Sequence, residues 1–232
     1  MSGKPKRRLK KEVKIILGIG AAFIAVAAIV LAFAHRDRFD YEKSLNEIVL
    51  TVDDTNISLK ELSYYIMQVE ETGESMAKAY NENNPLAYWN LYMNDKNESG
   101  YVTDLARRAA INFCIRDNIY AKEAMKSGMD MTQDELSDLR YDAQKKYELM
   151  KQKQRAATQL TAEDFEIILY KEQMAHKYIQ QLVENDNDDV LSAVVLKYDV
   201  DGTYYEQLKQ SYTITTNDKI ISHLKVGFIT IN

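Results

Sequence analysis

The chain has 232 residues, of which 46% are hydrophobic and 28% charged, and it contains only 2 prolines and 8 glycines. This composition argues against a disordered chain and is typical of a globular, helix-permitting protein that can bury a core. The single cysteine, Cys114, cannot form an internal disulfide, and its apolar neighbours indicate a buried structural thiol.

The N-terminus carries a basic segment followed by a long apolar one. Residues 15–34 read IILGIGAAFIAVAAIVLAFA without a charge, and about 20 such residues, rising about 1.5 Å each, cross a hydrocarbon core of about 30 Å. Seven bases and one acid precede them. By the positive-inside bias we expect a basic cytoplasmic tail at 1–14, a single transmembrane helix at 15–34 and an extracytoplasmic C-terminal part.

Cleavage and charge both bear on this prediction. Ala32-Phe33-Ala34 resembles a signal-peptidase site, so secretion after cleavage near Ala34 is the alternative. Signal peptides usually have an apolar run of about 7–15 residues, and the longer run here favours an uncleaved anchor. Residues 1–14 carry +6, so the rest of the chain carries −11 against the overall −5. This acidity argues against nucleic acid as a partner.

The extracytoplasmic part is expected to begin with a spacer and a short strand. Residues 35–47 are mostly charged or polar, whereas apolar and other residues alternate over residues 48–52, the pattern of a half-buried strand. Turn-forming residues follow at 53–56. Ser58 and Glu61 then have the spacing of a capping box, which predicts a helix start.

Further helices are predicted from the same kinds of signal. The first helix is expected to end or kink at Gly73, and a long, widely apolar helix over 104–127 is expected to stop at Gly128. Two more start signals pair Thr132 with Glu135 and Thr161 with Asp164. Between the first helix and the long helix at 104–127, an aromatic stretch at 86–93 begins after Pro85 and is followed by a polar loop at 94–100.

Residues 185–232 differ in character from the preceding helices. They favour Val, Ile, Thr and Tyr, with an Asp-Gly turn signal at Asp201-Gly202 and a short helix possible over 204–210. The sequence therefore predicts a mainly α protein, in which an N-terminal transmembrane helix precedes a helical module with a short leading strand and a small β-containing C-terminal tail.

Residues suited to catalysis or metal binding are sparse in this sequence. His35, His176 and His223 are scattered, and none has the spacing of a metal-ligand set with Cys, Asp or another His. The acidic pairs Asp53-Asp54 and Asp188-Asp189 are better explained by turns than by acid–base chemistry. We expect no cofactor, no metal and no catalytic residue.

Two segments resemble the SurA and PrsA families of extracytoplasmic chaperones and foldases. Val52-Asp53-Asp54-Thr55-Asn56-Ile57-Ser58-Leu59-Lys60-Glu61 is similar to their entry motif, although Asp54 stands where the families usually have Gly. The stretch Ala124-Met125-Lys126-Ser127-Gly128-Met129-Asp130-Met131-Thr132-Gln133-Asp134-Glu135-Leu136 is similar to their helix-break-helix signature. The resemblance covers about residues 48–183 and implies a SurA N-terminal-like, trigger-factor-like helical chaperone module at 48–184.

The resemblance implies an ATP-independent chaperone or foldase whose helices bind unfolded, secreted polypeptides. Many relatives add a parvulin-type prolyl isomerase domain, and residues 185–232 are too short to hold one. A truncated or degenerate peptidylprolyl isomerase is therefore one alternative, and a dedicated cell-envelope assembly protein is another. The aromatic stretch is either core or an exposed client-binding surface. The candidate client-contact residues are Tyr64, Tyr65, Met67, Tyr88, Trp89 and Tyr92.

Overall fold

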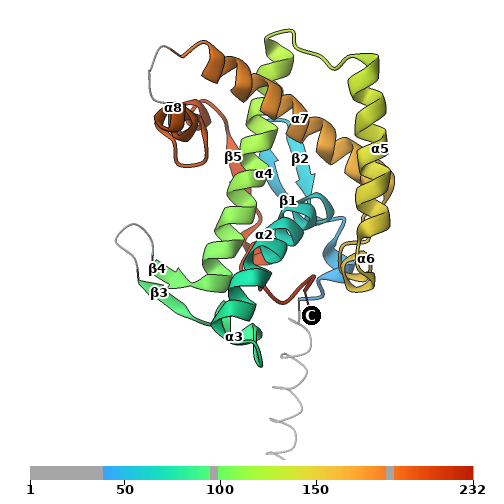
Figure 1. Cartoon of the computed structure of the whole chain (residues 1–232), viewed down its shortest axis with the longest axis vertical. Coiled ribbons are helices and arrows are strands. Elements are labelled where there is room, and N and C mark those ends of the chain that lie inside the picture. Colours follow the sequence, from blue (N-terminus) through green and yellow to red (C-terminus); the bar gives the residue numbers. More distant parts are fainter. Residues whose placement is uncertain (1–38, 95–98, 187–190, 232) are drawn as a thin grey trace, which may run out of the picture. The chain divides into compact units, whose positions relative to one another are not determined.

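Three long helices form the centre of the structure: α2 (Leu59–Tyr80), α4 (Val102–Lys126) and α7 (Ala162–Glu184), with α4 packed against both of the others (Figure 1). The structure is a computed structural model, and it describes residues 39–94, 99–186 and 191–231. The remaining elements are a 3-10 helix (Glu42–Ser44), β1 (Ile48–Val52), β2 (Thr55–Ser58), α3 (Leu86–Trp89), β3 (Tyr92–Asn94), β4 (Ser99–Tyr101), α5 (Gln133–Leu149), α6 (Gln152–Thr158), α8 (Leu191–Tyr198), α9 (Thr203–Lys209), β5 (Ile214–Thr216) and α10 (Asp218–Ile221).

The prediction of a mainly helical protein with small sheets is confirmed. The stretch Tyr41–Asn232 is one compact unit with its own apolar core, so we expect it to fold without residues 1–40. The predicted transmembrane segment at 15–34 lies outside the described residues. Among the helices that are described, none combines the length and the apolar character needed to cross a bilayer.

The predicted leading strand is confirmed as β1, the central strand of a three-stranded antiparallel sheet in the order β2-β1-β5. A tight turn at Asp53 and Asp54 joins β1 to β2, and Asp53 has a left-handed φ of 52°. The predicted turn was therefore too long, because Thr55 and Asn56 already belong to β2. The pairing of β1 with β5 brings residues more than 160 positions apart into one sheet.

The helix starts were predicted well because capping is local in the chain. Thr132 and Thr161 each exchange both hydrogen bonds of a capping box, with Glu135 and Asp164 respectively. Ser58 makes only half of one, since its Oγ accepts from the Glu61 N–H at 3.2 Å. The Glu61 carboxylate instead accepts from Lys171 Nζ at 2.7 Å and so joins α2 to α7. Gly128 ends α4 as expected, with φ 80°.

Gly73 does not end α2, which continues to Tyr80. A β-carbon at position 73 would lie 2.4 Å from Cη2 of Trp89, so glycine is needed there to admit the indole ring against the helix. The ring is covered from another side by Gly227, where φ is 97° and an added β-carbon would lie 2.1 Å from Trp89 Cδ2. Trp89 is therefore held between two glycines.

The prediction of a polar loop at 94–100 and of strands after residue 185 needs correction. Residues on both sides of 95–98 form the hairpin β3–β4, with Tyr92 paired to Tyr101. The segment around residues 191–198, read as a strand from its valines, is helix α8, and residues 222–231 form no strand. Tertiary packing overrides the weak β preference of such residues. The only strand described after residue 190 is β5.

The segment after α10 is fixed to α2 by one buried carboxylate. Glu70 accepts hydrogen bonds from the backbone N–H groups of Gly227 at 2.6 Å, Ile229 at 3.0 Å and Thr230 at 2.6 Å, and also from the Thr230 hydroxyl. Thr103 and Arg107 of α4 donate to the carbonyls of Val226 and Leu224. These bonds satisfy backbone groups that no helix or sheet satisfies.

Candidate functional site

An apolar groove of about 440 Å³ is bounded by α2, α3, β3 and α4. Its volume lies within the range of about 300–1,000 Å³ that is usual for ligand pockets. Helix α2 contributes residues at i, i+1, i+4 and i+5, and α4 contributes a matching stripe of apolar residues, because both helices turn one face toward the groove. The lining residues are Gln68, Val69, Thr72, Gly73, Tyr88, Trp89, Met93, Val102, Leu105, Ala106, Ala109 and Phe113.

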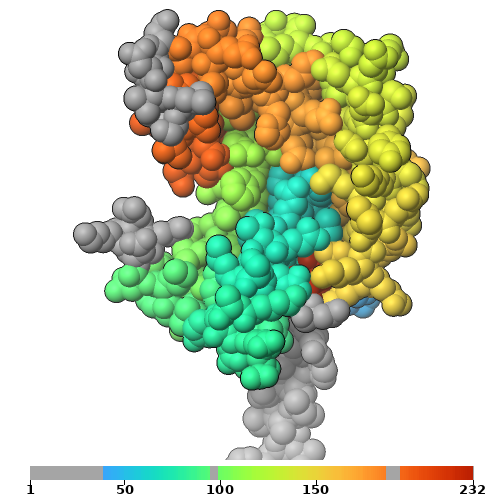
Figure 2. Space-filling view, in the orientation of Figure 1, coloured from blue at the N-terminus to red at the C-terminus, as the bar shows by residue number. Residues whose placement is uncertain are grey.

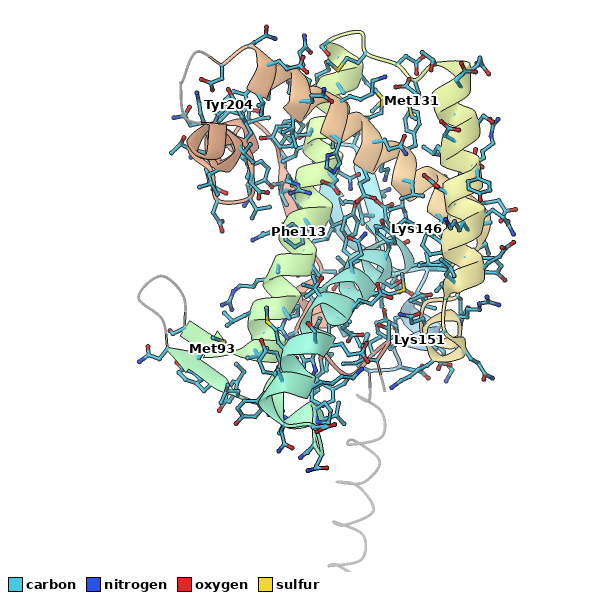
Figure 3. All side chains as sticks on the ribbon, in the orientation of Figure 1. Met93, Phe113, Met131, Lys146, Lys151 and Tyr204 are labelled. Atoms are coloured by element: carbon cyan, nitrogen blue, oxygen red, sulfur yellow. The ribbon has the colours of Figure 1, made fainter. Side chains whose placement is uncertain are left out.

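The figures show the elements that bound this groove. In Figure 2 the surfaces of α2 and α3 (teal) adjoin those of the β3–β4 hairpin and the first half of α4 (green). Figure 3 labels two of the lining residues, Phe113 on the middle of α4 and Met93 on the hairpin next to the start of that helix. Met93 is 42% exposed, so part of the groove wall is open to solvent.

Exposed aromatic and methionine side chains lie on the same elements as the groove. Tyr92 and Tyr101 are both more than half exposed, and their rings meet edge to face with centroids 5.3 Å apart. On α2, exposed Met76 accepts a hydrogen bond from the Tyr88 hydroxyl at 3.4 Å, and exposed Tyr80 lies 6.1 Å from the Tyr88 ring. A contiguous exposed apolar patch usually marks an interaction site.

Trp89 has an unsatisfied polar group at the groove. Its side chain is 1% exposed and lines the groove, and no described residue accepts a hydrogen bond from its Nε1–H. A buried donor without an acceptor costs about 1–3 kcal/mol. Gln68 and Thr72, on the α2 wall, are the polar groups among the lining residues.

The six predicted contact residues divide between the core and the surface. Tyr64, Tyr65, Met67 and Trp89 are buried in this structure, so their role as client contacts stays a prediction. The face of α2 that carries Tyr64 is covered by α7: Tyr64 Oη donates to Glu172 at 2.7 Å and its ring packs on Phe165. Trp89 and half-buried Tyr88 line the groove, whereas exposed Tyr92 precedes the lining residue Met93 in β3.

Sequence reasoning missed the contribution of α4 and the hairpin to the site. Leu105, Ala109 and Phe113 fall in the helix predicted over 104–127 but were not proposed as contacts. Val102 lies before the predicted start of that helix, and Met93 was seen only as part of the aromatic stretch. The signal that could have found them is the width of the apolar surface on α4, since one buried helix face does not need more than half the circumference.

A second apolar groove of about 410 Å³ lies where α4, α5 and α7 meet. Met125 and Ile167 are its most exposed apolar walls, and Leu136 and Tyr170 complete it. Its rim includes Glu166, which is paired with Arg140 at 3.0 Å.

Between α2, α4 and α7 lies a buried cluster of titratable groups. Burial raises the pKa of Asp117 to about 6, opposed by the Arg116 guanidinium, which donates to it at 3.0 Å. Arg116 also binds Asp199 at 2.7 Å. Burial raises the pKa of the Cys114 thiol, so the thiol stays protonated at neutral pH, as a structural cysteine does.

The comparisons with known proteins and the search for metal ligands add no assignment. Neither a family model, a curated protein nor a solved structure matches this chain. Within residues 39–94, 99–186 and 191–231, no three His, Cys, Asp or Glu residues are grouped so that they could hold a metal ion. The grooves and the exposed apolar side chains are therefore the features of the described residues that bear on function.

Proposed function

We propose that this protein is a membrane-anchored, extracytoplasmic chaperone of the SurA and PrsA kind, which binds unfolded secreted polypeptides without ATP. The observation that carries the proposal is the apolar groove between α2 and α4, together with the exposed Met and Tyr side chains beside it. An unfolded polypeptide gains about 25 cal/mol for each Å² of apolar surface that it buries there.

The types of side chain at the groove suit varied partners. Methionine is unbranched and adapts its shape, and tyrosine offers a large apolar ring with a polar tip. Met76, Met93, Tyr80 and Tyr92 are exposed on elements that bound the groove, and Tyr101 is exposed on β4, the strand paired with β3. Adaptable surfaces of this kind bind many sequences weakly, which is what a holding chaperone requires. A membrane anchor at 15–34 would raise the local concentration of this surface where polypeptides emerge from export.

The alternative favoured by a specific observation is a dedicated assembly protein of the cell envelope. A groove of defined shape, with a second groove between α4, α5 and α7, could equally hold one fixed partner.

Site-specific crosslinking in cells separates the two functions. A photo-reactive amino acid replacing Met93, which lines the groove and is 42% exposed, is compared with one replacing Tyr141, which is 67% exposed on α5. The chaperone proposal predicts many adducts of different size at Met93 and few at Tyr141. One dominant adduct would instead support the dedicated partner, and equal, sparse adducts at both positions would contradict both functions.

A further inference from the structure

The unpartnered indole N–H of Trp89 gives the groove a chemical preference beyond apolar character. Trp89 lines the groove, is 1% exposed, and has no acceptor among the described residues. Its ring cannot readily move away, because Gly73 and Gly227 hold it from two sides. A ligand that supplies an acceptor can pair this donor without first breaking a bond that the protein already makes.

We infer that the α2–α4 groove binds an extended polypeptide segment, taking an aliphatic or aromatic side chain between Phe113, Met93 and Tyr88 while a backbone carbonyl of the segment accepts a hydrogen bond from Trp89 Nε1–H. This inference rests on the proposed function and names the ligand class of its groove. A peptide fits because it carries apolar side chains and carbonyl acceptors at short, regular spacing.

The groove has the parts that such a segment needs. Apolar walls come from α4. On α2, Gln68 Nε2 already donates to Tyr64 Oη and Thr72 Oγ1 to the Gln68 carbonyl, which leaves the two side-chain oxygens as acceptors for peptide N–H groups. Met93, which is 42% exposed, and Tyr88, which is half-buried, line the groove together with the indole. They sit on short elements, the three-residue strand β3 and helix α3.

The chain contains one tryptophan, so its indole N–H gives a single NMR signal that reports on this site. The probe is the acetylated and amidated pentapeptide Lys-Leu-Phe-Leu-Lys, added to residues 36–232. The control probe is Lys-Ser-Gly-Ser-Lys with the same ends and charge. We expect the first peptide to shift the indole N–H signal downfield in a saturable way, and the second to leave it in place.

Two matched variants locate the binding. Met93→Glu places a carboxylate at this groove, and Met125→Glu makes the same change at a 49% exposed position of α4 that lines the other groove. Both positions are at the surface, so both variants are expected to fold. We expect Met93→Glu to weaken the affinity for the leucine peptide at least fivefold and Met125→Glu to change it less than twofold.

The outcomes separate this inference from the proposed function. Suppression of client aggregation with no shift of the indole signal, or with equal effects of both variants, would overturn the groove assignment and leave the chaperone proposal standing. A saturable shift of the indole signal without any suppression of aggregation would support the groove assignment and overturn the chaperone proposal. Dodecanoate serves as a third probe, and a saturable shift with dodecanoate but not with the leucine peptide would overturn the peptide assignment in favour of an acyl chain.

Discussion

At the scale of the residue, Gly73 shows how one position can be fixed by a distant side chain. Glycine inside a helix usually costs about 1 kcal/mol relative to alanine, yet here any β-carbon would lie 2.4 Å from Trp89 Cη2. The steric cost of alanine therefore outweighs its better helix propensity.

We expect Gly73→Ala to lower the free energy of unfolding by about 1–3 kcal/mol, the range for overpacking a core. Ser75→Ala, at an exposed position of the same helix, is the control and should change it by less than about 0.5 kcal/mol. Denaturant unfolding measures both. A Gly73→Ala protein as stable as the wild type would show that the indole is not held against α2.

Asp117 is a residue whose protonation should be visible in the stability of the whole unit. Its folded pKa of about 6 lies above the ordinary value, because burial penalises the carboxylate, and Glu172 adds to this while Arg116 and His176 oppose it. A raised folded pKa means that the native state binds the proton more tightly than the unfolded state. The stability that protonated Asp117 gives the native state is therefore fully present below about pH 4 and is lost as the pH rises through about 6.

The variant Asp117→Asn has no carboxyl group at this position, so its stability does not change through this titration. Relative to the wild type, its free energy of unfolding should rise by about 2 kcal/mol between pH 4 and pH 7. Urea unfolding of both proteins across that range makes the measurement, and taking the difference removes the titration of other carboxylates. A difference that does not depend on pH, or that falls with rising pH, would contradict the raised pKa.

At the scale of the element, local signals and long-range contacts differ in how well the sequence predicts them. Thr132 and Thr161 could be identified as caps, since their partners lie three residues away. The pairing of β1 with β5, and the contact of Glu70 with Thr230 across 160 residues, leave no trace in any short window. The helix α8 was missed because its valines favour a strand in isolation.

The candidate site was predicted only in part, because the burial of a helix face also depends on contacts between residues far apart in the chain. Periodicity places Tyr64 on an apolar face of α2 but does not say whether another helix covers that face. The structure shows that α7 covers it, whereas Tyr92 lies on the exposed hairpin.

The segment after α10 should depend on Glu70. In Glu70→Gln an amide N–H₂ replaces one of the carboxylate oxygens that accept from Gly227, Ile229 and Thr230. We expect a loss of about 2–3 kcal/mol in the free energy of unfolding, since buried donors lose a charged acceptor.

Hydrogen exchange gives the direct measurement of this effect. The amides of Gly227, Ile229 and Thr230 should exchange faster in Glu70→Gln and should be unchanged in Glu74→Gln, which affects only surface ion pairs with Lys78 and Lys151. Unaltered protection of those three amides in Glu70→Gln would mean that packing alone holds the segment.

At the scale of the whole molecule, a well-packed helical centre carries exposed, adaptable side chains near one apolar groove. Helix α4 packs against α2 and α7, while the β3–β4 hairpin and the C-terminal half of α2 carry exposed Tyr and Met side chains near an apolar groove. The proposed chaperone function requires this combination, because apolar side chains that are already exposed can bind unfolded chains without ATP.

The central claim is tested most directly by aggregation of a denatured client. Residues 36–232 are mixed with reduced α-lactalbumin at molar ratios from one tenth to equimolar, and light scattering is followed over time. Our account predicts that scattering falls progressively with added protein and is largely suppressed at the equimolar ratio. Scattering that stays unchanged at the equimolar ratio, with the protein folded, would contradict the account.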